Sequence, residues 1–174
     1  MRNLFKIPWS KSITACLAFT GFLLISYEIH GAAIEMDRDG RFIAYYDGTV
    51  LDTRTGLMWA AEDNGSDIDW PSAKKYCENF RGGGYSDWRM PTQEELAGLY
   101  DQSESRRALC GYDIHVATEL IAISCYALWA SETPGSETAH FPFYFGFRYW
   151  SLPSKPAGDC RALPVRSQWK FRRK

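Results

Sequence analysis

The amino-acid sequence predicts an α+β fold in which two short helices pack on short strands joined by long loops. Segments 69–80 and 92–100 show helical spacing of apolar residues. Apolar runs of strand length lie on both sides of them, bounded by glycine and aspartate turns. Aromatic residues make up 16% of the chain, which indicates a compact fold that fills the space between short elements with large rings.

The first 33 residues have the pattern of a secretory signal peptide. Three basic residues precede an uncharged apolar stretch at 13–25, which is shorter than the ~20 residues of a membrane-spanning helix. Gly31, Ala32 and Ala33 supply small residues for cleavage. We expect cleavage after Ala33 and export to the periplasm or the medium. The alternatives are an uncleaved membrane anchor and a lipoprotein start at Cys16.

The charge of the exported part argues against nucleic-acid binding. Residues 34–174 carry 17 basic and 20 acidic side chains, and five of the basic ones lie in the last nine residues. A mildly acidic globule lacks the basic surface that nucleic acids require. The basic tail at 168–174 is either solvated or in contact with an anionic surface. We therefore place the globular domain at 34–167.

The segment 42–60 predicts two short strands followed by a polar loop. Asp47-Gly48 is typical of a hairpin turn, and Thr55-Gly56 begins a second apolar run. The loop at 61–69 holds four side chains whose oxygen atoms suit calcium, but their spacing does not match an EF-hand. We expect them to bond their own backbone and predict no metal site. These four are Asp63, Asn64, Ser66 and Asp67.

The first helix is predicted from Asp69, its N-cap, to Phe80. Pro71 is tolerated in the first turn, where it removes no intrahelical hydrogen bond. Glycines at 82–84 end the helix. A phosphate-binding loop needs its glycines between a strand and a helix N-terminus, and these follow a helix instead. The glycines therefore do not form a nucleotide motif.

The second helix is predicted over 93–100 by a capping box of Thr92 and Glu95, with Pro91 before it. Glu94 and Glu95 are adjacent, so they do not face each other as a catalytic carboxylate pair would. Downstream, the runs "ALWASE", "HFPFYFGFRYW" and "CRALPVRS" predict strands, the last irregular because of Pro164. No catalytic residue is predicted.

Four cysteines remain in the exported chain: Cys77, Cys110, Cys125 and Cys160. An even number in an exported protein predicts structural disulfides, and the sequence leaves all three possible pairings open. Neither a C-x-x-C motif nor a Cys/His cluster is present, so no zinc site or other cofactor is predicted.

The segments "GTVLDTRTGLMWA", "WPSAKKYCENFRGGGYSDWRMPTQEELAGLYD", "WASE" and "RALPVRS" resemble the Lcl C-terminal domain family, named for a bacterial collagen-like adhesin. The resemblance implies a C-type lectin-like fold, with two helices packed on a small, twisted, mostly antiparallel sheet and long irregular loops. It also implies the disulfides Cys77–Cys160 and Cys110–Cys125. Finally, it implies structural roles for Trp88, Arg89, Pro91, Thr92, Glu95 and Trp129.

The resemblance further implies an exported, non-enzymatic binding or adhesion module for a glycan or a surface protein. The calcium-sugar tripeptides of lectins are absent, so calcium-dependent sugar binding is not predicted. Ligand contacts are expected in the loops 103–110 and 134–156. About half of the aromatic residues at 141–150 should belong to the core. Tyr144 and Arg148 are predicted to be exposed, and the predicted ligand-binding set is Tyr144, Arg148, Tyr149 and Trp150.

Two alternatives remain. "DWRMPTQEEL" is also similar to a stretch of the formylglycine-generating, sulfatase-modifying enzymes, and "CRALPVR" is similar to their terminal strand. That activity would need a reactive cysteine pair, and the chemistry is unavailable if Cys160 is locked in a structural disulfide. The second alternative is a structural component of the cell envelope.

Overall fold

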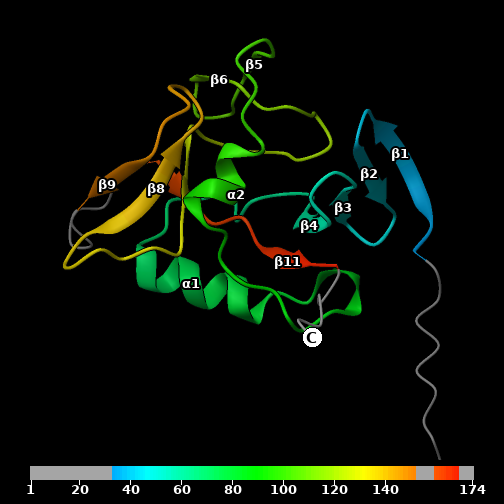
Figure 1. The fold of residues 1–174 in the computed structure, drawn as a ribbon, viewed down its shortest axis with the longest axis horizontal. Coiled ribbons are helices and arrows are strands. Elements are labelled where there is room, and N and C mark those ends of the chain that lie inside the picture. Colours follow the sequence, from blue (N-terminus) through cyan, green and yellow to red (C-terminus); the bar gives the residue numbers. More distant parts are fainter. Residues whose placement is uncertain (1–32, 152–158, 169–174) are drawn as a thin grey trace, which may run out of the picture. The chain divides into compact units, whose positions relative to one another are not determined.

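The computed structural model describes residues 33–151 and 159–168, and all but the last residue of the predicted signal peptide and all but the first of the basic tail lie outside these ranges. The described part contains two α-helices and mostly antiparallel sheets, which confirms the α+β class (Figure 1). The finer likeness to C-type lectins stays a prediction. In the part of the chain that the structure describes, no helix is long and apolar enough to cross a membrane.

A five-stranded antiparallel sheet in the order β1-β2-β3-β4-β11 combines the N-terminal strands with the last one. The turn between β2 and β3 contains Gly48, whose φ is +78°. The sequence predicted strands in 42–60 but did not predict β1, whose residues are all exposed. The strands are β1 (Glu35–Asp39), β2 (Phe42–Tyr45), β3 (Thr49–Asp52), β4 (Leu57–Ala60) and β11 (Val165–Ser167).

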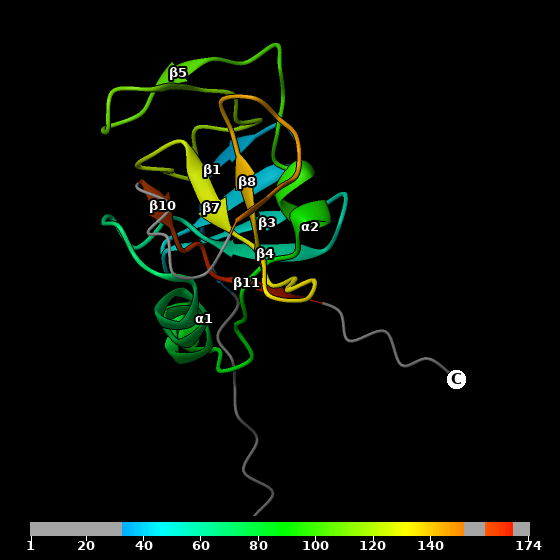
Figure 2. The same ribbon diagram turned by 90° about the vertical axis from the view of Figure 1, so that its left-hand side faces the viewer.

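A four-stranded sheet has the order β10-β7-β8-β9, and a two-stranded hairpin, β5–β6, forms a separate sheet. The β5–β6 hairpin and α1 lie at opposite ends of the domain (Figures 1 and 2). The strands are β7 (Ala127–Trp129), β8 (Thr138–Pro142), β9 (Tyr149–Ser151), β10 (Cys160–Arg161), β5 (Arg106–Arg107) and β6 (Asp113–Ile114).

Two strand predictions need correction. The aromatic run at 140–150 is a hairpin of β8 and β9 and not one strand, because the chain turns at Gly146, whose φ is +73°. The final run is divided into β10 and β11 by residues 162–164. Pro164 lies in this break, where its missing N–H interrupts no ladder hydrogen bond. Its carbonyl still accepts a hydrogen bond of 2.9 Å from the backbone of Ala60.

Both predicted helices form with the predicted N-caps. α1 (Trp70–Asn79) begins where the Asp69 carboxylate accepts from the Ser72 amide at 2.8 Å. A 3-10 turn at Gly82–Gly84 follows. α2 (Gln93–Ala97) has the complete capping box of Thr92 and Glu95. It is shorter than the predicted 93–100 because regular helical bonding ends at Gly98.

The apolar side chains gather in two clusters. The main cluster joins the five-stranded sheet and α2 to the strands β6, β7 and β8, and it includes Trp59, Leu96 and Phe141. The second cluster lies between α1 and the strands β7 and β10. Its members are Ala73, Cys77, Met90, Ala127, Trp129, Cys160 and Ala162.

The disulfide predictions have different outcomes. Cys110 and Cys125 form a disulfide bond, as predicted. The predicted bond between Cys77 and Cys160 does not form in the structure: both are free, buried thiols. The two side chains pack instead as small apolar groups in the second cluster.

Candidate functional site

The arginine-proline segment before α2 ties the helix to the last strand. The Arg89 guanidinium donates to both carboxylate oxygens of Glu95 at 2.6 and 2.7 Å. Glu95 also accepts from the Thr92 amide at 2.9 Å. The backbone of Arg89 exchanges two hydrogen bonds with Val165 of β11. The Arg89 guanidinium and backbone and the Glu95 carboxylate are therefore engaged in the framework.

The electrostatics of Glu95 follow from this arrangement. Burial of the carboxyl acts to raise its pKa, but the hydrogen bonds from Arg89 and Thr92 outweigh that effect and hold the pKa below its ordinary value. The carboxylate thus stays ionised near neutral pH and serves as a fixed cap, not as a proton donor.

The tryptophans predicted to be structural are buried and hydrogen-bonded to the backbone. Trp88 donates to the carbonyl of Gly82 at 3.1 Å and packs edge-to-face on Phe80. Trp129 donates to the carbonyl of Ile68 at 2.7 Å. The carbonyl of Pro91 accepts from the Ser131 amide at 2.8 Å, which joins the α2 entrance to the segment after β7.

The polar loop at 61–69 also serves the framework. The Asp63 carboxylate accepts from the Gly65 and Ser124 amides, both at 2.7 Å. Asn64 accepts from the Ala162 amide at 2.7 Å, and Asp67 pairs with Arg161. Within residues 33–151 and 159–168, no group of three or more His, Cys, Asp or Glu side chains is placed to hold a metal ion.

The turn between β8 and β9, residues 143–148, is held firmly on the domain. Phe143 is buried, its amide donates to the Tyr126 carbonyl at 2.6 Å, and its carbonyl accepts from the His115 amide at 3.0 Å. At Gly146 the backbone lies directly on the Tyr100 ring, so that an added Cβ would come within 2.2 Å of it. The turn is therefore fixed at two points.

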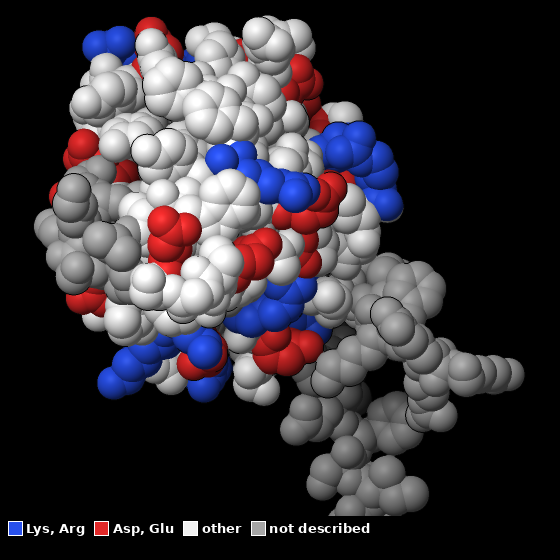
Figure 3. Space-filling view, turned by 60° about the vertical axis from the view of Figure 1, so that its left-hand side comes forward, with Lys and Arg blue, Asp and Glu red and all other residues white. Residues whose placement is uncertain are grey.

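This turn presents aromatic rings to solvent. Tyr144, Phe145 and Phe147 are 46%, 57% and 52% exposed, and Tyr112 from the β5–β6 hairpin is 45% exposed. The rings touch in series, with centroids 6.5 Å apart for Tyr112 and Tyr144, 4.5 Å for Tyr144 and Phe145, and 5.3 Å for Phe145 and Phe147. We call these four residues the aromatic loop surface. The face of the domain in Figure 3 carries a broad region without charged side chains above a charged lower half.

The four predicted ligand-binding residues do not form one site. Tyr144 belongs to the aromatic loop surface. Arg148 precedes β9 and forms an ion pair with Glu94 of α2. Tyr149 and Trp150 are neighbours in a strand and therefore point to opposite faces of it. Tyr149 packs against the ring of His140 with centroids 5.0 Å apart, on the face away from the main cluster.

Arg148 and Trp150 line a groove beside α2. Its other walls are Gln93, Glu132 and the segment that leads to Glu137, and its volume is about 790 Å³. Sequence reasoning identified Trp150 and Arg148 but not Glu132 or Glu137. These two acids come from the loop between β7 and β8, and only the hairpin brings them close to Trp150.

Three groups with strongly shifted pKa values, one imidazole and two thiols, lie in the described part of the chain. Burial lowers the pKa of His140 to about 4, and its Nδ1 has no hydrogen-bond partner among the described residues. Burial also raises the pKa of the Cys77 and Cys160 thiols to about 12. The histidine is thus neutral and the thiols protonated near pH 7, so neither is prepared for acid–base or nucleophilic chemistry.

A model of one protein family, described as the Lcl C-terminal domain, matches residues 48–169. The matched segment contains both helices, the aromatic loop surface and the groove beside α2. No curated protein matches the chain.

Proposed function

Because the chain belongs to the Lcl C-terminal domain family, we propose that it is an exported, non-enzymatic binding module that attaches to a partner protein through the aromatic loop surface. The observation that carries this proposal is the set of four half-exposed aromatic rings, three of them on a turn that is fixed at Phe143 and Gly146 and the fourth, Tyr112, in contact with them from the β5–β6 hairpin. Exposed contiguous apolar surface of this kind marks interaction sites on soluble domains.

The chemistry of the surface favours a protein over a sugar. Phe145 and Phe147 have no polar atoms, and they stack on each other with an interplanar angle of 27°. Each ring therefore already covers part of its neighbour, and the ring edges and outer faces of the pair can enter an apolar pocket on a partner protein. Aromatic anchors held in place before binding are typical of the centre of protein interfaces.

The enzymatic alternative is disfavoured by the state of the thiols. A formylglycine-generating type of reaction needs an accessible, reactive cysteine. Cys160 is buried in the second cluster, and burial raises its pKa to about 12. These features support a binding role over thiolate chemistry.

The test is attachment of the labelled domain to intact cells, measured by flow cytometry on a panel of cell types. Replacing Phe145 and Phe147 together with serine should weaken attachment about tenfold or more, since central aromatic anchors carry much of the binding energy. Trypsin treatment of the cells should remove attachment. The matched control is Tyr46→Ser, at an exposed tyrosine outside the surface, which should attach like the wild type.

Undiminished attachment of the double variant would rule out the aromatic loop surface. Attachment that survives trypsin but is lost after periodate oxidation of the cells would replace the protein partner with a glycan. Export is tested separately by N-terminal sequencing of the protein expressed from the full chain. We expect Ile34 as the first residue, whereas an intact Met1 would contradict cleavage of the signal.

A further inference from the structure

The groove beside α2 has one aromatic wall. Trp150 is 41% exposed and pairs in register with Ala139 of β8, so its ring lies on the same face of the hairpin as the main-cluster side chains. The exposed part of Trp150 lines the groove. An exposed tryptophan at the edge of a groove offers a flat apolar face with a polar N–H at its rim.

The floor of the groove is rigid. Gln93 is buried at the start of α2, and its side-chain amide nitrogen, Nε2, donates to the carbonyls of His140 at 3.1 Å and Tyr149 at 2.8 Å. Gln93 thus fastens β8 to β9 directly beneath the groove. The bond to the Tyr149 carbonyl fixes the backbone immediately before Trp150.

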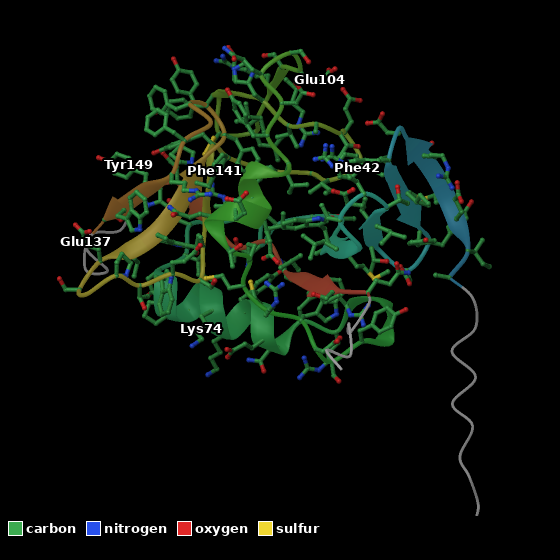
Figure 4. All side chains as sticks on the ribbon, in the orientation of Figure 1. Phe42, Lys74, Glu104, Glu137, Phe141 and Tyr149 are labelled. Carbon is green, nitrogen blue, oxygen red and sulfur yellow. A yellow bond between two sulfur atoms is a disulfide. The ribbon has the colours of Figure 1, made fainter. Side chains whose placement is uncertain are left out.

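The opposite wall supplies hydrogen-bond acceptors. The two carboxylate oxygens of Glu132 accept from the backbone amide of Gln93 at 2.9 and 3.1 Å. These bonds fix the position of the carboxylate while leaving Glu132 partly exposed. The Glu137 carboxylate is exposed and has no partner among the described residues. Figure 4 shows Glu137 at the same end of the domain as Tyr149 of β9.

Negative charge predominates in the groove. Glu132, Glu137 and Arg148 line the groove, and the Arg148 guanidinium is already paired with Glu94, which is outside the lining. The carboxylates of Glu132 and Glu137 are therefore not balanced by it. The groove therefore repels anions. It can accept hydrogen bonds at the two remaining carboxylates and donate them from the free N–H groups of Arg148.

We infer that this groove is a binding site for an uncharged oligosaccharide. One pyranose ring stacks on Trp150, and its hydroxyl groups donate to Glu132 and Glu137. A pyranose combines an apolar face with a rim of hydroxyl groups, which matches a flat ring opposite a row of acceptors. The surplus of carboxylates disfavours sulfated and uronic-acid glycans. The site is separate from the aromatic loop surface and does not depend on the proposed function.

The test is a titration of the domain with cellotriose, chitotriose, mannotriose and a sulfated heparin disaccharide, followed by saturation-transfer NMR and by tryptophan fluorescence. At least one neutral trisaccharide should bind, and the sulfated disaccharide should not. Trp150→Ala should weaken binding about tenfold or more, whereas Trp150→Phe should retain most of it. Glu137→Gln, which keeps the shape but removes the charge, should weaken binding severalfold.

The matched control is Tyr149→Ala, because it removes an equally exposed ring from the other face of the same strand. This variant should bind the neutral sugar like the wild type. Equal losses at 149 and 150, binding of the sulfated sugar, or no binding by any neutral trisaccharide would each overturn the inference. The Phe145 and Phe147 double variant should still bind sugar, so a failure of the aromatic loop surface can be distinguished from a failure of the groove. Circular dichroism verifies that each variant is folded.

Discussion

Replacing Gly146 with alanine tests whether the turn at 143–148 is fixed against the core. The backbone at Gly146 has a φ of +73°, a conformation that costs an L-residue about 1–2 kcal/mol. The new Cβ would also lie 2.2 Å from the Tyr100 ring, which is itself in edge contact with Phe141 and His115. Relieving that overlap costs about 1–3 kcal/mol. The free energy of unfolding should therefore fall by about 2–5 kcal/mol.

Gly135 provides the matched control for this substitution. Its φ is +63°, but a Cβ at that position would meet nothing within 4 Å. Gly135→Ala should show only the conformational cost, about 1–2 kcal/mol. Urea unfolding followed by tryptophan fluorescence gives both values. If the two alanine variants lose the same stability, the turn is not packed on Tyr100, and the rigid display of Phe145 and Phe147 loses its support.

Three further predictions concern the framework. Replacing both cysteines of the Cys110–Cys125 bond, which lie 15 residues apart, with alanine should lower the free energy of unfolding by about 3 kcal/mol, and an unchanged urea midpoint would contradict this. Cys77 and Cys160, with pKa values of about 12, should resist a thiol reagent at pH 8 in the folded protein and both react in urea; no reaction in urea would mean that they are bonded. The pKa of Glu95 is lowered by folding, so its contribution to stability is complete above about pH 4.5 and is lost as the pH falls through the folded-state value. The stability difference between wild type and Glu95→Gln should therefore be largest at neutral pH and vanish in acid, whereas a difference independent of pH would refute it.

The parts of the fold that depend on contacts within one helical turn could be predicted from the sequence. Asp69 and Thr92 each accept from an amide three residues ahead, so their roles as caps need no knowledge of the tertiary structure. The same holds for Glu95, whose capping bond reaches back to Thr92. Its second partner, Arg89, is six residues away and emerges only with the folded chain.

The candidate binding surfaces could be predicted only in part. Alternating aromatic residues continue through the turn at 143–148, so the pattern hides the hairpin, and Gly146 was the available signal for it. Strand periodicity already places Tyr149 and Trp150 on opposite faces, and the sequence prediction grouped them nevertheless. Tyr112 joins the aromatic rings from a distant hairpin, and no local signal indicates that contact.

The cysteines show a different limit. Pairing depends on the distance and direction of two Cβ atoms, which the sequence does not contain. Cys110 and Cys125 meet because the segment between them folds back on itself, with a Cα separation of 5.2 Å. Cys77 and Cys160 share a cluster without forming a bond, so membership of one apolar cluster is not sufficient to predict a disulfide.

The two proposed binding surfaces share one structural unit, the β8–β9 hairpin, which supplies aromatic residues to both. The turn of the hairpin displays Phe145 and Phe147, and the returning strand displays Trp150 beside the groove. Gln93 fastens the two strands through main-chain carbonyls, while Gly146 holds the turn on Tyr100. Since these fastenings are made by residues outside the displayed set, the exposed side chains can be replaced without removing what holds the hairpin. A framework of this kind separates recognition from folding, and for that reason single substitutions on the hairpin can assign each surface its own ligand.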